Sequence, residues 1–399
     1  MSLLKYELKK LLRPGVLAMI VPLLLIVAVI MGLNFITTAS HYRENGNPES
    51  RYGYSRGHEG PIRQDVASRA EAQVHRESSG RPDHQDAYTA DKSVEVQFGI
   101  EYANAAERLD KYRYGDESEK SGAPYSLDGI TRRLAQLKDA GKAGTYEYKS
   151  LEKQLDMNIK SGEPEYFYVD SWETLFEILS TNGWCFFLIV LLVIIAAPVF
   201  SNEYSTGMDS ILFSTRKGRF GVVTAKLAAL MIIASVLALL TNLSLYISSM
   251  AAEGIYGSQA PLKSISAYFL SPYSLSMLQF YLVQLGVQLL GCLAAILLTA
   301  FLSSRLASPL PVFFISLAAI LYPVILVDQV QISAKWVEPV YYLSVFQLVR
   351  VYNLFAAYRA YNLFGSPILY PYLLIPLVIL FGALMAVLTY RTIKYREVC

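Results

Sequence analysis

The chain has 399 residues, of which 53% are hydrophobic and 17% are charged, and its formal net charge at pH 7 is +2. A charge so close to zero gives no basis for binding nucleic acid, which requires a strongly basic surface. The three cysteines, Cys185, Cys292 and Cys399, are too scattered to form a disulfide framework.

Six apolar stretches of the chain are long enough to cross a membrane. A helix rises about 1.5 Å per residue and the hydrocarbon core is about 30 Å thick, so about twenty apolar residues are needed. Such helices also satisfy their own backbone hydrogen bonds, as lipid requires. We therefore predict an all-α polytopic membrane protein with six transmembrane helices, at Val16–Ile36, Gly183–Ser201, Val222–Ser249, Met277–Ser303, Ala307–Val327 and Leu369–Tyr390.

The distribution of basic residues predicts the orientation of these spans, because Lys and Arg near helix ends are retained on the cytoplasmic side. We therefore expect a multi-pass protein of a bacterial cell membrane with both termini in the cytoplasm. A cleaved signal peptide is the alternative for the first stretch, although that stretch exceeds the roughly 7–15 apolar residues usual in such peptides. With six crossings, all the basic clusters fall on one side: Lys5, Lys9, Lys10 and Arg13; Arg216, Lys217, Arg219 and Lys226; Arg305; and Arg391, Lys394 and Arg396.

Residues 1–36 are predicted to hold an amphipathic interfacial helix, rich in leucine on one side and lysine on the other, followed by the first span. Residues 37–181 form a large insert that this topology places outside the cell. Its first part, from His41 to Asp86, contains few large apolar residues. We therefore expect no sizeable core there, and much of this part to be mobile.

The insert has a helical pattern from Ser93 onward. Residues 139–145, with two glycines, provide a turn between two apolar stripes, which predicts a helical hairpin. The stripes are Ile130, Leu134 and Leu137, and then Tyr148, Leu151 and Leu155. We expect the aromatic segment that follows to lie at the membrane surface before the second span; it contains Tyr166, Phe167, Tyr168 and Trp172.

The sequence contains no motif for catalysis or metal binding. It lacks the phosphate-binding loop Gly-x-x-x-x-Gly-Lys-Ser/Thr, and also His-Glu-x-x-His and Gly-x-Ser-x-Gly. We therefore assign no catalytic residue and no cofactor to this chain. The histidines match no compact ligand pattern and no cysteine joins them, so we expect solvated side chains and no metal at His41, His58, His75 and His84.

Charged groups are missing from the interior of the predicted spans, where ion-coupled transporters usually keep relay groups. Energy for uphill transport would therefore come from a partner. Three uncharged residues, Asn242, Gln284 and Gln288, are candidates for lining a pathway, and interhelical hydrogen bonding is the simpler interpretation.

The segment after the second span, residues 202–221, has the features of a loop that contacts a partner. Glu203 leaves the membrane, and a short amphipathic helix carries Ile211 and Leu212. Arg216 and Lys217 then form a basic turn. An ordinary basic connector that fixes topology is the alternative interpretation.

Four residues of this region carry a resemblance to a known family. Glu203 is followed by Gly207 four residues later, by Arg219 twelve further on and by Lys226 after another seven. In this pattern the chain resembles the permease subunits of ABC exporters of the second export class, which handle antibiotics, peptides, lipids and polysaccharides. Arg216 is a departure, because many members have proline there. The amphipathic start resembles the elbow helix of the family, and region 329–368 resembles its external re-entrant helices.

The resemblance implies a permease built from residues 1–36 and 182–399, embedded in membrane lipid and paired with the same or a similar subunit. Two cytoplasmic ABC ATPases, which bind ATP and magnesium, would drive it. Loop 202–221 would be the coupling helix, with Arg216, Lys217 and Arg219 contacting the ATPase or merely fixing topology. The expected substrate is amphipathic, such as an antimicrobial peptide or a lipid-like molecule.

The long insert departs from the simplest members of the family and suggests a domain that captures, gates or guards the exit. Two functions of other classes remain open. One is a membrane sensor or regulatory scaffold whose extracytoplasmic domain binds a ligand. The other is a membrane-embedded enzyme, for which the spans offer no catalytic group.

Overall fold

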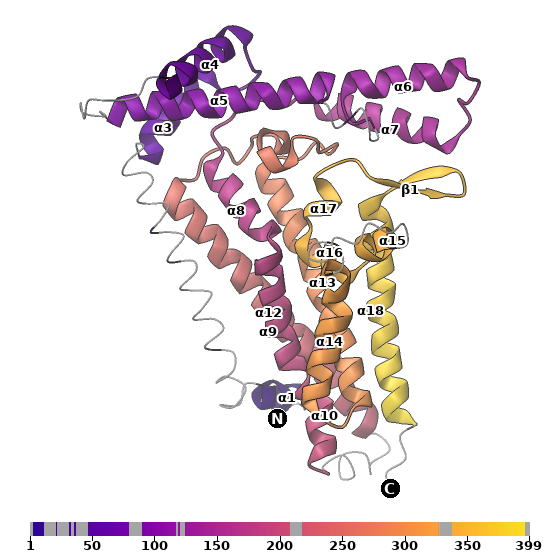
Figure 1. The fold of residues 1–399 in the computed structure, drawn as a ribbon. Coiled ribbons are helices and arrows are strands. Elements are labelled where there is room, and N and C mark those ends of the chain that lie inside the picture. The colour runs from indigo at the N-terminus through magenta and orange to yellow at the C-terminus, as the bar shows by residue number, and fades with distance from the viewer. Residues whose placement is uncertain are drawn as a thin grey trace.

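The computed structural model describes residues 3–11, 47–79, 90–116, 124–207, 218–325 and 337–395, together with positions 21, 32, 36, 119 and 327. The fold is mostly helical. Long helices stand side by side in a bundle, and a transverse layer of helices lies across one end of it (Figure 1). The bundle contains α8 (Asp170–Ser180), α9 (Asn182–Ala196), α10 (Pro198–Ser205), α12 (Gly218–Glu253), α13 (Met277–Arg305), α14 (Pro309–Val324) and α18 (Tyr370–Lys394).

Four helices are long and apolar enough to cross a membrane, which fits an all-helical membrane protein. They correspond to the second, third, fourth and sixth predicted spans, and they run over Gly183–Ser205, Phe220–Glu253, Met277–Arg305 and Tyr370–Lys394. The fifth predicted span is α14, whose 16 residues cover about 24 Å. The first predicted span lies outside the described residues, apart from positions 21, 32 and 36.

Helix α13 is the centre of the bundle, because it packs against α9, α12, α14, α16 (Val345–Arg350) and α18. A glycine allows the close approach of α13 to α16. A Cβ atom added at Gly291 would lie only 2.8 Å from the backbone nitrogen of Val349 in α16. A larger residue would therefore force α16 away from the centre of the bundle.

The transverse layer consists of α3 (Pro48–Ser55), the 3-10 helix η1 (Arg56–His58), α4 (Gln64–Ser79), α5 (Ala90–Tyr114), α6 (Leu127–Asp139) and α7 (Tyr146–Ser161). Our expectation of no sizeable core between His41 and Asp86 is wrong for residues 47–79. Alanines of α4 allow a close approach to α5, whose rings fill the space. The core there contains Val66, Ala67, Ala70, Phe98, Tyr102, Ala105, Ala106 and Tyr166.

The predicted helical hairpin is confirmed as α6 and α7. Ser126 and Thr145 cap the two helices, since each side-chain oxygen accepts a backbone N–H three residues later. Gly141 takes a positive φ of 66° in the turn between the helices. The two predicted stripes face one another, with Ile130, Leu137 and Leu151 buried between them.

The aromatic segment before the second span packs against protein, with Tyr166, Tyr168 and Trp172 buried and Phe167 half-buried, and its place at the membrane surface stays a prediction. Tyr168 is packed near Tyr52 and Tyr256, and Trp172 lies near Tyr246 and Tyr281. The indole Nε1 of Trp172 donates to the carbonyl oxygen of Tyr256 at 2.8 Å. The segment therefore joins the transverse layer to the bundle.

The chain between α14 and α18 contains short helices and the only strands among the described residues. These helices are α15 (Val337–Tyr342), α16 and α17 (Tyr352–Phe355). Elsewhere, the connection between α12 and α13 contains two 3-10 helices, η3 (Leu262–Ser264) and η4 (Ser266–Tyr268). Strands β1 (Ala360–Leu363) and β2 (Ser366–Leu369) form an antiparallel hairpin that leads directly into α18. The described fold is therefore all-α apart from this one short hairpin, which the sequence did not predict.

Candidate functional site

A group of four charged side chains, three of them buried, joins three helices at the end of the bundle where both chain termini lie (Figure 1). Glu7 and Lys10 belong to α1 (Leu3–Leu11), Glu203 to α10 and Lys226 to α12. Lys226 Nζ lies 2.7 Å from Glu203 Oε1 and 3.2 Å from Glu7 Oε2. Lys10 forms a further ion pair with Glu203. We call these four residues the ion-pair cluster.

Three members of the ion-pair cluster are almost inaccessible to water, and the fourth, Lys10, is 23% exposed. Lys226, Glu203 and Glu7 are 1%, 3% and 4% exposed. Two positive and two negative charges cancel, which limits the free-energy cost of burying them. The ammonium of Lys226 also donates to the carbonyl oxygen of Val199 at 3.2 Å. Removing one member would leave an uncompensated buried charge, so the cluster holds α1, α10 and α12 together as one unit.

A break in the second span positions Glu203. Pro198 cannot donate a backbone hydrogen bond, so the helix is interrupted between α9 and α10. The hydroxyl of Ser303 in α13 compensates for the break. It accepts the N–H groups of Phe200 and Ser201 at 3.0 and 3.1 Å, and it donates to the carbonyl oxygen of Ala197 at 2.7 Å.

Gly207 ends the segment that carries Glu203. It follows α10 with a φ of 67°, in the left-handed region that stops a helix and that glycine adopts without strain. Its N–H donates to the carbonyl oxygen of Tyr204 at 3.3 Å. The glycine of the predicted pattern is therefore placed where the chain must turn out of the helix.

The other residues of the predicted coupling loop are described less fully. Ile211, Leu212, Arg216 and Lys217 lie outside the described residues. Arg219 lies in the first turn of α12, where its backbone alone is described. Their contact with an ATPase remains a prediction.

The three predicted pathway residues are buried between helices. Asn242 Nδ2 donates to Gln288 Oε1 at 2.7 Å, and Gln288 Nε2 donates to the carbonyl oxygen of Val349 at 2.9 Å. These bonds connect α12, α13 and α16, as the simpler interpretation expects. Gln284 is 1% exposed, and its amide has no hydrogen-bond partner within the described ranges. A pathway role for these residues remains a prediction.

Sequence reasoning missed Glu7, which completes the ion-pair cluster. The signal was present, because Glu7 is the single acidic residue in the basic amphipathic helix α1. Nothing in the sequence pairs it with Lys226, which is 219 residues away.

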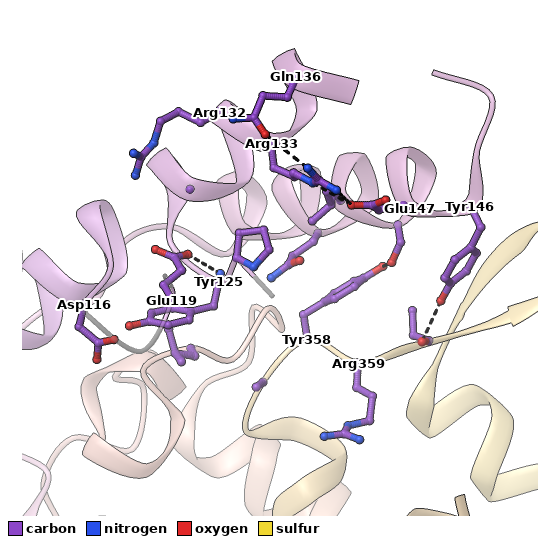
Figure 2. Close-up of a pocket in the computed structure, with 18 of the residues that line it drawn as sticks. Asp116, Glu119, Tyr125, Arg132, Arg133, Gln136, Tyr146, Glu147, Tyr358 and Arg359 are labelled. Carbon is purple, nitrogen blue, oxygen red and sulfur yellow. Dashed lines mark hydrogen bonds and ion pairs between the residues drawn. The ribbon is translucent and has the colours of Figure 1, made fainter. Parts of the chain in front are cut away.

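A second site, a cavity of about 1120 Å³, lies at the opposite end of the bundle, between the α6–α7 hairpin and segment 357–360 (Figure 2). Figure 2 shows Asp116, Glu119 and Tyr125 along one side and Tyr146 and Glu147 along the other. Tyr358 and Arg359 enter from the segment that leads to β1. Ligand pockets commonly have volumes of roughly 300–1,000 Å³, so this cavity is large enough for one.

The charged groups of the cavity are largely paired with one another. Arg133 Nη2 lies 2.7 Å from Glu147 Oε1, and Arg359 Nη1 lies 3.3 Å from Glu338 Oε1. The carboxylate of Glu119 accepts the N–H of Tyr125 at 2.6 Å. Paired charges and tyrosine rings make a lining suited to a polar ligand that carries aromatic groups or both signs of charge.

Arg51 joins the transverse layer to the bundle. Its guanidinium lies 2.8 Å from Asp170 Oδ2 in α8 and forms an ion pair with Glu101 of α5. Burial, followed by the nearby negative charge of Asp170, raises the pKa of Glu101 to about 7, although Arg51 and Gln97 act in the opposite direction. This junction therefore contains a carboxyl group that titrates near neutral pH.

Within the part of the chain that the structure describes, no three His, Cys, Asp or Glu side chains are placed to hold a metal ion. Cys185 and Cys292 are free and buried in apolar helices. Burial in apolar surroundings makes these two thiols unreactive.

Comparisons of the chain with family models, with curated proteins and with solved structures give no match. The resemblance to a family consequently depends on the sequence pattern, above all the spacing of Glu203, Gly207, Arg219 and Lys226.

Proposed function

We propose that this chain is the permease subunit of an ATP-driven ABC exporter, and that the ion-pair cluster transmits the motion of a cytoplasmic ATPase to the spans. One observation carries the proposal. Glu203 and Lys226, two of the four residues behind the family resemblance, are direct partners, and both contact the amphipathic helix α1. A coupling device needs these connections between loop, spans and elbow helix.

The position of the cluster supports a mechanical role. Glu203 lies near the end of one candidate membrane-spanning helix and Lys226 lies near the beginning of the next, so the helices on both sides of the loop are held together. A force on this loop moves α10 and α12 together, because separating a buried ion pair is costly. The break at Pro198, stabilised by Ser303, provides a point where α10 can tilt relative to α9.

In this proposal six spans cross the membrane, and both termini and loop 202–221 face the cytoplasm. Residues 37–181 and region 329–368 lie outside. The exposed apolar faces of α12 and α18 are available to lipid and to a second, identical or similar permease subunit. They include Val236, Leu240, Leu243, Ile247, Leu380 and Val387. The exported substrate is an amphipathic peptide or a lipid-like molecule.

Affinity purification of the detergent-solubilised chain from its own cells tests this function. We expect an ATPase with a phosphate-binding loop to copurify with the native chain and with the surface variant Lys160→Gln, whose side chain is 71% exposed. Recovery of the chain in folded form without any ATPase would contradict export.

The cavity between the α6–α7 hairpin and segment 357–360 favours a second candidate, a membrane sensor or regulatory scaffold. Such a protein would bind its ligand at this cavity and signal through α18, which follows the segment directly. It would need no ATPase, so the same purification distinguishes the two functions.

A further inference from the structure

The tip of the β1–β2 hairpin has an unusual composition for a tight turn. Phe364 and Gly365 are the two turn residues, with φ values of 52° and 81°. Two positive φ angles in a two-residue loop are typical of turns that favour Asn-Gly, because L residues with large side chains rarely adopt them. The side chain of Asn362 accepts the N–H of Gly365 at 2.9 Å, which stabilises the turn.

Packing within the chain does not explain phenylalanine at this position. The Phe364 side chain is 98% exposed, and the adjacent Leu363 is 43% exposed. A strained backbone position with a large apolar side chain in water is unfavourable for the isolated chain. The described part of the chain therefore offers this ring no packing partner.

The hairpin is placed at the level where α18 would leave a membrane. Helix α18 has 25 residues, about 37 Å of rise, and its last turn carries Arg391 and Lys394. If these basic residues lie among the headgroups, the hydrocarbon core extends back about twenty residues, to the beginning of α18. Tyr372, in the first turn of α18, is 70% exposed, as expected for an interfacial aromatic residue.

The orientation of the hairpin is fixed from its other side. Tyr146 and Lys153 of α7 donate to the carbonyl oxygens of Ala360 and Pro367, both at 2.9 Å. Figure 1 shows the hairpin projecting sideways from the top of α18, beneath the α6–α7 hairpin. The tip therefore points along the plane of a membrane that α18 crosses.

We propose that the hairpin tip, Leu363 and Phe364, inserts into the interfacial region of the lipid leaflet next to the start of α18. The lipid surface is the occupant that fits, because the hairpin leads directly into α18, the least buried of the four spanning candidates and one with an exposed apolar face. The inference requires that α18 crosses a membrane, and it is independent of whether the chain exports anything.

A tryptophan introduced at the tip tests the insertion. Phe364→Trp in phosphatidylcholine liposomes is compared with the native chain, whose three tryptophans provide the background, and with Tyr114→Trp at a 65% exposed position of α5. We expect the added emission of Phe364→Trp to be blue-shifted, lost for the most part in lipid brominated near the headgroup, and resistant to iodide. The added emission of Tyr114→Trp should respond to iodide alone.

Two outcomes would overturn the inference. Quenching of both variants by iodide would place the tip in water, and protection from both iodide and brominated lipid would place it against protein, such as a second copy of the chain. If Phe364→Trp does not fold, Phe364→Cys with an environment-sensitive dye gives the same readout in a Cys399→Ser chain, since Cys185 and Cys292 are buried.

Discussion

Lys226 Nζ and Glu203 Oε1 lie 2.7 Å apart, in a position where the two side chains are 1% and 3% exposed. The pair links the end of one long apolar helix to the beginning of the next. It differs in kind from exposed pairs such as Lys160 with Asp156, because water screens those and their net contribution to stability is about 0–1 kcal/mol.

Replacing Lys226 by methionine should destabilise the chain strongly. The change leaves Glu7 and Glu203 buried with Lys10 as their remaining cation in the cluster. Loss of one partner from a buried pair typically costs about 3–5 kcal/mol. Thermal unfolding in detergent at a fixed scan rate should therefore show a large fall in Tm, whereas Lys160→Gln should leave the Tm nearly unchanged.

The double variant Glu203→Gln with Lys226→Met should lose less stability than the sum of the two single variants. The reason is that the double change removes one charge of each sign, so the cluster stays neutral. We expect a coupling free energy of about 0.5–3 kcal/mol. Strict additivity of the changes in free energy would contradict a direct interaction between these side chains.

Gly207→Ala and Gly221→Ala should have opposite effects on stability. Gly207 has a φ of 67°, which costs an alanine about 1–2 kcal/mol. Gly221 lies inside α12, where alanine is favoured by roughly 0.5–1 kcal/mol. An added Cβ at either glycine meets no atom of the described residues within 4 Å, so clashes with them do not complicate the comparison. A rise in Tm for both variants would contradict the left-handed backbone conformation of Gly207.

Ser303→Ala should lower the stability of the chain at the break between α9 and α10. It leaves the buried N–H groups of Phe200 and Ser201 without their acceptor, at about 1–3 kcal/mol for each unsatisfied group. Ser235→Ala is the matched control, since this hydroxyl is half-buried and donates to the carbonyl oxygen of Met231 in its own helix. Equal Tm values for the two variants would show that Ser303 does not support the break.

The stability of the folded chain should fall as the pH rises, because Glu101 at the junction between the transverse layer and the bundle loses its proton. The pKa of this carboxyl is about 7 in the folded chain, against an ordinary value of 4.5. The folded state therefore binds the proton more tightly, and the resulting stability is complete below about pH 4.5 and lost as the pH passes 7. The Tm of the native chain, relative to that of Glu101→Gln, should decline between pH 5 and pH 8. Parallel curves would contradict this assignment.

The parts of the fold that follow local periodicity were predictable from sequence. Apolar runs located four of the long helices, and apolar stripes with a glycine turn located α6 and α7. The spacing of Glu203, Gly207 and Lys226 likewise identified residues that the structure places at an ion pair and a helix end.

The remaining features depend on contacts between distant segments. Glu7 reaches Lys226 across 219 residues, and no local pattern encodes such a pair. In the core between α4 and α5, α4 contributes mainly small alanines, which composition alone does not mark as core residues. The aromatic rings that pack against them belong to later parts of the sequence. The β hairpin escaped notice because its turn uses Phe364 with Gly365 where asparagine or aspartate would signal a tight turn.

The most direct measurement is ATP hydrolysis by the copurified complex in liposomes, comparing the native chain, Glu203→Gln and Lys160→Gln. If the ion-pair cluster couples ATPase to permease, Glu203→Gln should lose the ATPase or should uncouple hydrolysis from substrate, and Lys160→Gln should behave as the native chain. The coupling role of the ion-pair cluster would be contradicted if substrate stimulated ATP hydrolysis equally in all three complexes. It would also be contradicted if the native preparation contained no ATPase.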